Sequence, residues 1–316
     1  MRRTIAAGVL AVANGVAVAG PRVAIVAAAT NTANEQTADR FTDPRDKLMS
    51  TGLFDEVAII STTPYGGGHT PTLAELLQYD AVLTWTNDSH DDSVGVGNVL
   101  ADYVDAGGGV VVSVFTNTSL NPDRQLLGRW ADEGYGLIPT ASNYANASAP
   151  LAMGDVLIEG HPILTGVESF RSFAAIVPSF GPWGAFRPNT TLVNPGAHKL
   201  ALWEDGKTLI VVGDTTTPGG HKVVELGMHP VSSAVNSTGY WDESTDGARM
   251  MANALLWAAF GPADWTMDGA VNFDDVIGFL GAFGAGVEAA DLDFSGGPDF
   301  TDVVLFLQAF GEATGP

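Results

Sequence analysis

Oxygen-bearing side chains recur at positions one, three, five, nine and twelve of two twelve-residue segments near the end of the chain. In the first segment they are Asp264, Thr266, Asp268, Asn272 and Asp275, and in the second they are Asp291, Asp293, Ser295, Asp299 and Asp302. The sixth position is glycine in both segments, and the seventh-position carbonyls of Ala270 and Gly297 would each add a ligand. Because Ca²⁺ takes about six to eight oxygen ligands and its loop turns sharply at a glycine, the pattern predicts two calcium ions.

An apolar stripe with helical spacing follows each of these loops. It consists of Val276, Phe279, Leu280 and Phe283 after the first loop, and of Val303, Phe306, Leu307 and Phe310 after the second. The two loop-and-stripe segments align without gaps at an offset of 27 residues. We therefore expect two helices that pack face to face and hold the loops as a pseudo-twofold pair. The alternative is that the acidic turns only cap the two helices.

The last 55 residues differ in composition from the rest of the chain. Residues 262–316 contain ten acidic residues and no Lys or Arg. This change marks residues 261–316 as a small all-α module that follows a larger domain.

A loop and a single helix, repeated in tandem at this spacing, resemble the type I dockerin, an EF-hand-like module. The resemblance implies calcium-dependent binding of a cohesin-like or cell-surface protein within an assembly related to polysaccharide catabolism. The tenth and eleventh loop positions, often Ser-Thr in dockerins, are Phe273-Asp274 and Phe300-Thr301 here. This departure leaves the identity of the partner open, and Phe273 and Phe300 would offer it a symmetric apolar pair.

Residues 20–260 form the larger domain, and their pattern of apolar residues predicts its helices and strands. Apolar runs predict buried strands, and helical spacing predicts helices between them. The predicted strands are 23–28, 57–61, 81–85 and 110–115, with a later meander at 199–203, 208–212 and 222–226; the predicted helices are 43–53, 94–106 and 248–259. Alternation of strands and helices favours an α/β, flavodoxin-like, mostly parallel sheet with helices on both faces. Residues 121–194 read as long loops with short strands.

Residues 77–85, 103–112 and 253–257 give this domain a resemblance to the class I glutamine amidotransferase-like superfamily, and to its trehalose-utilisation-type branch. In that superfamily a Gly-x-Cys-x-Gly elbow and a His-Pro-Glu motif complete a catalytic triad. Here residues 113–117 read Ser-Val-Phe-Thr-Asn, the chain has no cysteine, and Val231 follows His229-Pro230 in place of the acid. Glutamine-dependent amide transfer by that triad is therefore excluded.

Ligands of parallel sheets bind beyond the carboxyl ends of the strands. The weak catalytic candidates expected there are His229, His90 and Asp88, for acid–base chemistry or divalent metal binding. The competing interpretation is structural, with Asp88 or Asp91 as a helix N-cap and His229 at a strand exit. Trp183 and Trp241, with Tyr240 and Phe186, could stack on a carbohydrate ligand or simply cover the core.

The net charge limits the possible partners of the protein, and the N-terminal sequence predicts where the protein is found. The chain has 14 basic and 36 acidic residues, a net charge of −22, which excludes nucleic-acid binding by phosphate neutralisation. Residues 1–19 have the basic head, apolar stretch and small-x-small site of a secretory signal peptide, and no membrane span is expected in the mature chain.

The sequence thus predicts a secreted or cell-surface calcium-binding protein that docks into an extracellular assembly. The alternatives are a hydrolase or isomerase acting on a sugar derivative in the α/β pocket, and a purely structural surface protein.

Overall fold

The computed structural model describes residues 20–30, 37–139 and 143–315. The predicted signal peptide, residues 1–19, lies outside the described residues. None of the helices in the described ranges is long and apolar enough to cross a membrane.

A nine-stranded sheet runs through the larger part of the described chain, in the order β2-β1-β3-β4-β13-β12-β11-β6-β7. The parallel strands are β2 (Glu56–Ser61), β1 (Arg22–Ala27), β3 (Ala81–Thr84), β4 (Gly109–Ser113) and β13 (Val223–Leu226). The antiparallel extension consists of β12 (Thr208–Gly213), β11 (Ala197–Trp203), β6 (Leu151–Val156) and β7 (Arg171–Ser172). The parallel half has the flavodoxin-like strand order, so the predicted α/β class is confirmed there.

The antiparallel pairing of β11 with β12 is explained by the short connection between these strands. Residues 204–207 join β11 to β12 as a tight turn in which Gly206 has φ 79°. A connection this short can only join antiparallel neighbours, whereas parallel strands need a crossover. The predicted meander is confirmed, and β6 and β7 are two of the short strands expected between residues 121 and 194.

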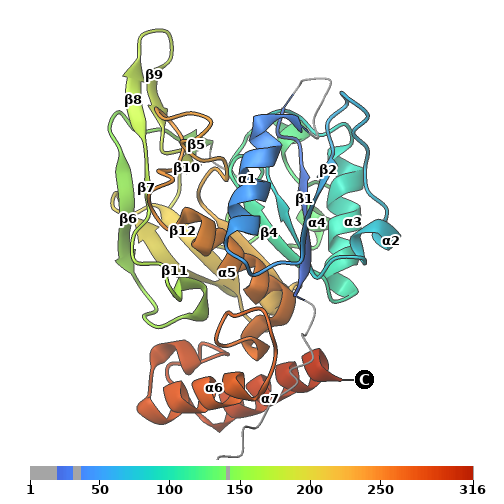
Figure 1. The fold of residues 1–316 in the computed structure, drawn as a ribbon, viewed down its shortest axis with the longest axis vertical. Coiled ribbons are helices and arrows are strands. Elements are labelled where there is room, and N and C mark those ends of the chain that lie inside the picture. The colour runs from blue at the N-terminus through green and yellow to red at the C-terminus, as the bar shows by residue number, and fades with distance from the viewer. Residues whose placement is uncertain (1–19, 31–36, 140–142, 316) are drawn as a thin grey trace, which may run out of the picture.

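Helices cover both faces of the sheet (Figure 1). On one face, α1 (Asp39–Ser50) and α5 (Gly247–Phe260) pack in a core that includes Ile25, Leu83 and Trp257. On the other, α2 (Leu73–Leu76), α3 (Ser93–Asp105) and α4 (Arg129–Asp132) pack against residues that include Val26 and Val112. The alternation of buried side chains along β1 and β4 produces these two separate cores.

Three predicted boundaries were wrong. Helix α1 begins at Asp39, four residues before the predicted start, so Pro44 lies inside it rather than in its first turn. The N-cap of α3 is Asp92, whose carboxylate accepts a hydrogen bond from the Gly95 amide at 2.8 Å, and is neither Asp88 nor Asp91. Strand β4 ends at Ser113, two residues early, because the chain turns there into residues 114–117.

Short elements fill the region between α4 and β11, as predicted. Besides β6 and β7, they are β5 (Tyr144–Ala145), β8 (Ala174–Val177), β9 (Gly181–Gly184) and β10 (Arg187–Pro188), with a 3₁₀ turn at Pro162–Leu164. Another 3₁₀ turn, Pro122–Arg124, precedes α4. The β8–β9 hairpin projects beyond the large sheet (Figure 1). Further 3₁₀ turns lie at Gly220–Lys222, Gly261–Ala263 and Glu288–Ala290.

Two helices, α6 (Phe273–Ala285) and α7 (Phe300–Thr314), form the C-terminal segment below the sheet domain (Figure 1). The rings of Phe279 and Phe306 stack at a centroid distance of 4.2 Å and an interplanar angle of 1°. The predicted face-to-face packing is therefore confirmed. The predicted stripe is too wide, because Leu280 and Leu307 are exposed on the outer sides, where a single pair of helices leaves nothing to cover them.

The C-terminal segment packs against the sheet domain through its loops. Trp265, Met267 and Leu292 are buried in the same hydrophobic cluster as α5. The Arg249 guanidinium donates a hydrogen bond of 2.9 Å to the Met267 carbonyl, and the ring of Phe294 stacks on His198 at 3.8 Å. The two parts thus share a continuous core.

The stacked phenylalanine pair gives a stability prediction. Phe279→Ala should lower the free energy of unfolding by about 3–5 kcal/mol, because it leaves a cavity between the two helices. Ile277→Ala, on the exposed side of the same helix, should change it by less than about 1 kcal/mol. Urea denaturation followed by circular dichroism measures both. Equal effects of the two substitutions would contradict the packing.

Candidate functional site

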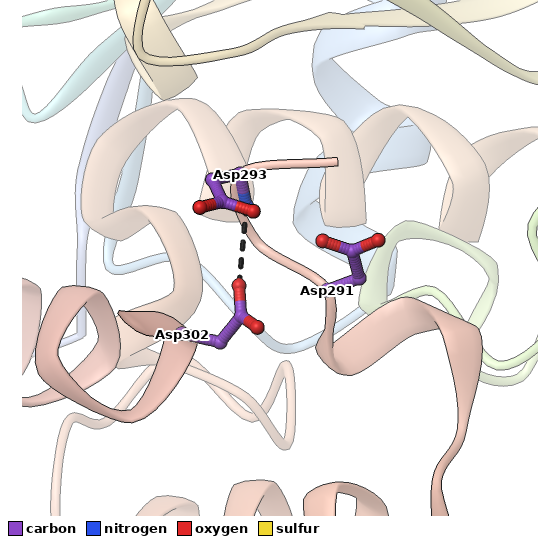
Figure 2. Close-up of side chains that lie close together, drawn as sticks. All are labelled: Asp291, Asp293 and Asp302. Atoms are coloured by element: carbon purple, nitrogen blue, oxygen red, sulfur yellow. Dashed lines mark hydrogen bonds between the residues drawn. The ribbon is translucent and has the colours of Figure 1, made fainter. Parts of the chain in front are cut away.

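The second predicted calcium loop brings its acidic side chains together. Carboxylate oxygens of Asp291, Asp293 and Asp302 lie within 4.8 Å of one another. Within the described part of the chain, these three residues form the cluster of acidic side chains that could hold a metal ion. Figure 2 shows the three carboxylates around one space, with the Asp293 amide donating to an oxygen of Asp302 at 3.3 Å. Asp291 and Asp302 are 6% and 0% exposed. Three carboxylates this close repel one another unless a cation or protons neutralise them.

Backbone amides and unusual dihedral angles shape this loop. Asp291 accepts hydrogen bonds from the amides of Ser295, Gly296 and Gly297 at 2.7–2.9 Å. Phe294 adopts φ 55°, and Gly296 adopts φ 116° at the sixth position, where the sequence predicted a glycine-dependent turn. The chain therefore wraps around the first ligand position as the spacing predicts.

The first loop has a similar pattern of hydrogen bonds from backbone amides to its acidic side chains, but its carboxylates do not form a group of three. Asp264 accepts from the Gly269 amide at 3.0 Å, and Asp275 accepts from the Thr266 amide and hydroxyl, both at 2.9 Å. Asp264 and Asp275 are fully buried. Burial, with the nearby Asp275 charge, raises the pKa of Asp264 to about 6. Asp268 accepts from the Ala270 amide at 2.9 Å and does not complete a three-acid group.

The ninth-position residues also cap helices. Asn272 accepts from the Asp274 amide at 2.8 Å, and Asp299 accepts from the Thr301 amide at 2.6 Å. Both form capping boxes with the twelfth-position acid, Asp275 or Asp302. The capping interpretation is therefore realised, but it leaves the burial of Asp264 and Asp291 at the first positions unexplained, since their carboxylates cap neither α6 nor α7.

The donor set of both loops fits calcium. All predicted side-chain ligands are hard oxygens, and the segment 262–316 has no Lys or Arg that could neutralise its buried acids. A divalent cation held by Asp291, Asp293 and Asp302, and another by Asp264 and Asp275, would offset the cost of burying these charges.

In the α/β part, two of the three weak catalytic candidates lie near the point where the strand order reverses, between β1 and β3. The amide of Asp88 donates to the carbonyl of Ala28 at 2.9 Å, and the Asp88 carboxylate accepts from the Ser89 amide. His90 is 4% exposed, with Nδ1 at 2.8 Å from the Thr62 hydroxyl, and burial lowers its pKa to about 4. The described contacts pair neither histidine candidate with a carboxylate.

His229 lies in an aromatic cluster. Its ring stacks on Tyr240 at 4.6 Å and lies 5.6 Å from the ring of Phe115. Burial, with the charges of Arg40 and Arg124, lowers its pKa to about 3, and Nε2 has no hydrogen-bond partner among the described residues. Phe115 occupies the centre of the elbow segment, where the resembled superfamily has its cysteine, so an apolar ring stands beside this histidine in place of a nucleophile.

Of the two interpretations of Trp183, Trp241, Tyr240 and Phe186, three of the four residues follow the one in which they cover the core. Trp241, Tyr240 and Phe186 are each 3% exposed or less. The indole of Trp241 donates to the Pro230 carbonyl at 2.8 Å, so this ring covers the core. Trp183 is only partly buried and contacts Phe180 at the exposed β8–β9 hairpin.

Sequence reasoning missed Glu225. This residue is 2% exposed in β13, and burial raises the pKa of its carboxyl to about 7. The available signal was a lone acid inside the apolar strand run 223–226, a position where a carboxylate is costly unless it is used.

No family model matches the chain, and no curated protein matches it significantly. Solved structures with similar folds include ThuA-like proteins from Parabacteroides merdae and Bacteroides uniformis. They are 12% and 14% identical, with 77% and 76% of this chain and 91% and 92% of those chains covered, and both TM-scores are 0.48. A cold-adapted β-galactosidase from Rahnella sp. R3 is 16% identical over 74% of this chain, which spans 31% of that enzyme, with a TM-score of 0.43. At these identities the similarity concerns the fold alone.

The buried His229 predicts a pH effect on stability. Its folded pKa lies below the ordinary value of 6.5, so the unfolded chain takes up the proton first as the pH falls. Between about pH 6.5 and pH 3 this residue should therefore destabilise the fold by up to about 1.4 kcal/mol per pH unit. His229→Phe, which keeps the stack on Tyr240, should flatten the pH dependence of the unfolding free energy. Urea denaturation at pH 7 and pH 5 measures this, and parallel slopes would contradict it.

Proposed function

We propose that the protein is a secreted calcium-binding protein that docks through residues 261–316 into an extracellular or cell-surface, polysaccharide-related assembly. The partner is a cohesin-like protein, and the α/β domain, without the Cys-His-Glu triad, is the cargo. The observation that carries the proposal is the space enclosed by Asp291, Asp293 and Asp302, in the loop where the ligand spacing predicted it.

The outer sides of α6 and α7 support a docking role. Phe273 and Phe300, at equivalent positions of the two repeats, are 70% and 76% exposed. Ile277 and Leu280 on α6 are exposed, as are their counterparts Val304 and Leu307 on α7. Exposed apolar side chains in this number, on helices whose other sides are packed, are typical of a protein-binding surface.

The sugar-directed hydrolase or isomerase remains the alternative proposal. The aromatic surroundings of His229 do not favour it, because a general base needs a path to its substrate.

Calcium binding is tested by titration calorimetry on the full chain after chelator treatment. We expect two ions per chain for the wild type, and one for Asp302→Asn or Asp275→Asn, since each removes the carboxylate that closes its loop. Asp274→Asn is the matched control, because this exposed residue occupies the eleventh position, which contributes no ligand. Absence of calcium uptake by a folded wild type, or two ions in both loop variants, would refute the calcium part of the proposal.

Docking is tested with the full chain as bait for the secreted and envelope proteins of its source, with calcium and with chelator. The expected result is a cohesin-like protein captured only with calcium, and captured at least tenfold less by Phe273→Ser/Phe300→Ser. Capture that is unaffected by chelator, or no cohesin-like protein in either condition from a calcium-loaded bait, would contradict docking.

A further inference from the structure

A cavity of about 290 Å³ lies at the carboxyl ends of β4 and β13, on the face of the sheet covered by α3 and α4. Its walls are largely apolar, with Val112, Leu126 and Ile138 among them, and the indole of Trp130 forms one side. The cavity is separate from the calcium loops, since none of its lining residues belongs to the segment 261–316.

Two buried acceptor atoms in this cavity are left without partners. Glu225 is 2% exposed and Asn117 is 3% exposed. One carboxyl oxygen of Glu225, Oε1, accepts from the Leu137 amide at 2.7 Å, but no described donor lies in hydrogen-bonding geometry within 3.5 Å of Oε2 or of the Asn117 oxygen Oδ1. A buried acceptor without a donor lowers the stability of the fold by about 1–3 kcal/mol. A ligand that donates hydrogen bonds to these two atoms would remove that cost.

The lining supplies negative charge and no positive charge. Glu225 is the sole charged residue among the described residues that line the cavity. Burial raises its pKa, and the backbone amides of Leu137 and Ile138 and the nearby Asn117 side chain lower it; no charged side chain contributes. The amide nitrogen of Asn194, also in the lining, already donates to the Gly136 carbonyl at 2.8 Å. The lining also holds neutral donors, the Trp130 indole N–H and the Thr116 hydroxyl, but its one charged group is an acid, which disfavours anions.

We propose that this cavity binds a small organic cation, a primary ammonium on a short apolar stem, with Glu225 Oε2 and Asn117 Oδ1 accepting its N–H groups. An ammonium carries three donors and no acceptor, which complements the two free oxygens. The Trp130 ring and the aliphatic wall would hold the stem, and aromatic faces attract cations. This site goes beyond the calcium-dependent docking proposed above, because it assigns a ligand to the α/β domain itself.

Gly136 provides a way to narrow the cavity beside Glu225 without contacting the two unpaired acceptor atoms. A Cβ atom at this position would lie 3.7 Å from Glu225 Oε1 and 3.8 Å from Trp130 Nε1, at ordinary contact distance. The backbone of Gly136 is not among those with positive φ, so alanine is compatible with it. Gly136→Ala therefore places a methyl group between the carboxyl and the indole while leaving both in place.

The test is calorimetric titration of the full chain with butylammonium, and with 1-butanol as a neutral probe of the same shape. We expect saturable one-to-one binding of butylammonium and none of 1-butanol. Glu225→Gln, which keeps the shape and removes the charge, and Gly136→Ala should each weaken binding at least tenfold. Glu204→Gln, which removes an exposed charge outside the cavity, should bind as the wild type does.

The pH dependence adds an independent readout. Because the cation binds the deprotonated carboxyl, whose pKa is about 7, affinity should rise about tenfold between pH 6 and pH 8. Equal binding of 1-butanol would point to a hydroxyl-bearing ligand and overturn the proposal. So would binding that survives Glu225→Gln, or no saturable binding by a folded wild type, in which case a protonated Glu225 serves the fold alone.

Discussion

Buried carboxylates without basic partners impose the main physical constraint on this protein. Asp264, Asp275 and Asp302 are fully buried, and the segment that contains them has no Lys or Arg. An ionised carboxylate taken out of water is costly unless a charge or several hydrogen bonds compensate it. Backbone amides of the loops supply hydrogen bonds, but the charge itself remains. A cation bound in the loops, as proposed above, would supply the missing positive charge and stabilise the C-terminal segment.

The loops were predictable because their chemistry is local in sequence. Ligand positions, the glycine turn and the capping boxes all lie within twelve residues, so spacing alone places them. The flavodoxin-like half of the sheet was predictable for a similar reason, since its central strands β1, β3 and β4 are buried apolar runs. The positions of the antiparallel edge strands were not, because β6 and β7 are short or partly polar, and they are strands only through the pairing of β6 with β11 and of β7 with β6.

The α/β pocket could not be judged from residue types. His229 and His90 have the chemistry of catalytic groups, but their environment decides their state. His229 lies between aromatic rings beside two arginines, and His90 is held by a threonine hydroxyl. Glu225 shows the opposite case, since a strand residue of ordinary appearance lies in a cavity with an unpaired oxygen. Contacts between residues far apart in the sequence determine the environments of these histidines and of Glu225, and residue types and spacing do not predict such contacts.

The contact between the two parts would carry the effect of a bound calcium ion from the loops to the α/β domain. Phe294, in the middle of the second loop, stacks on His198, whose Nε2 lies 2.9 Å from an Asp214 carboxylate oxygen. Met267, in the middle of the first loop, is buried and accepts the Arg249 hydrogen bond from α5. Both residues adopt positive φ, a conformation that non-glycine residues hold only when their surroundings require it. Since the loops keep this shape while contacting the α/β domain, a cation that stabilises the loops also stabilises that interface. Residues 261–316 are in this sense part of the folded core of the protein as well as a module at its end.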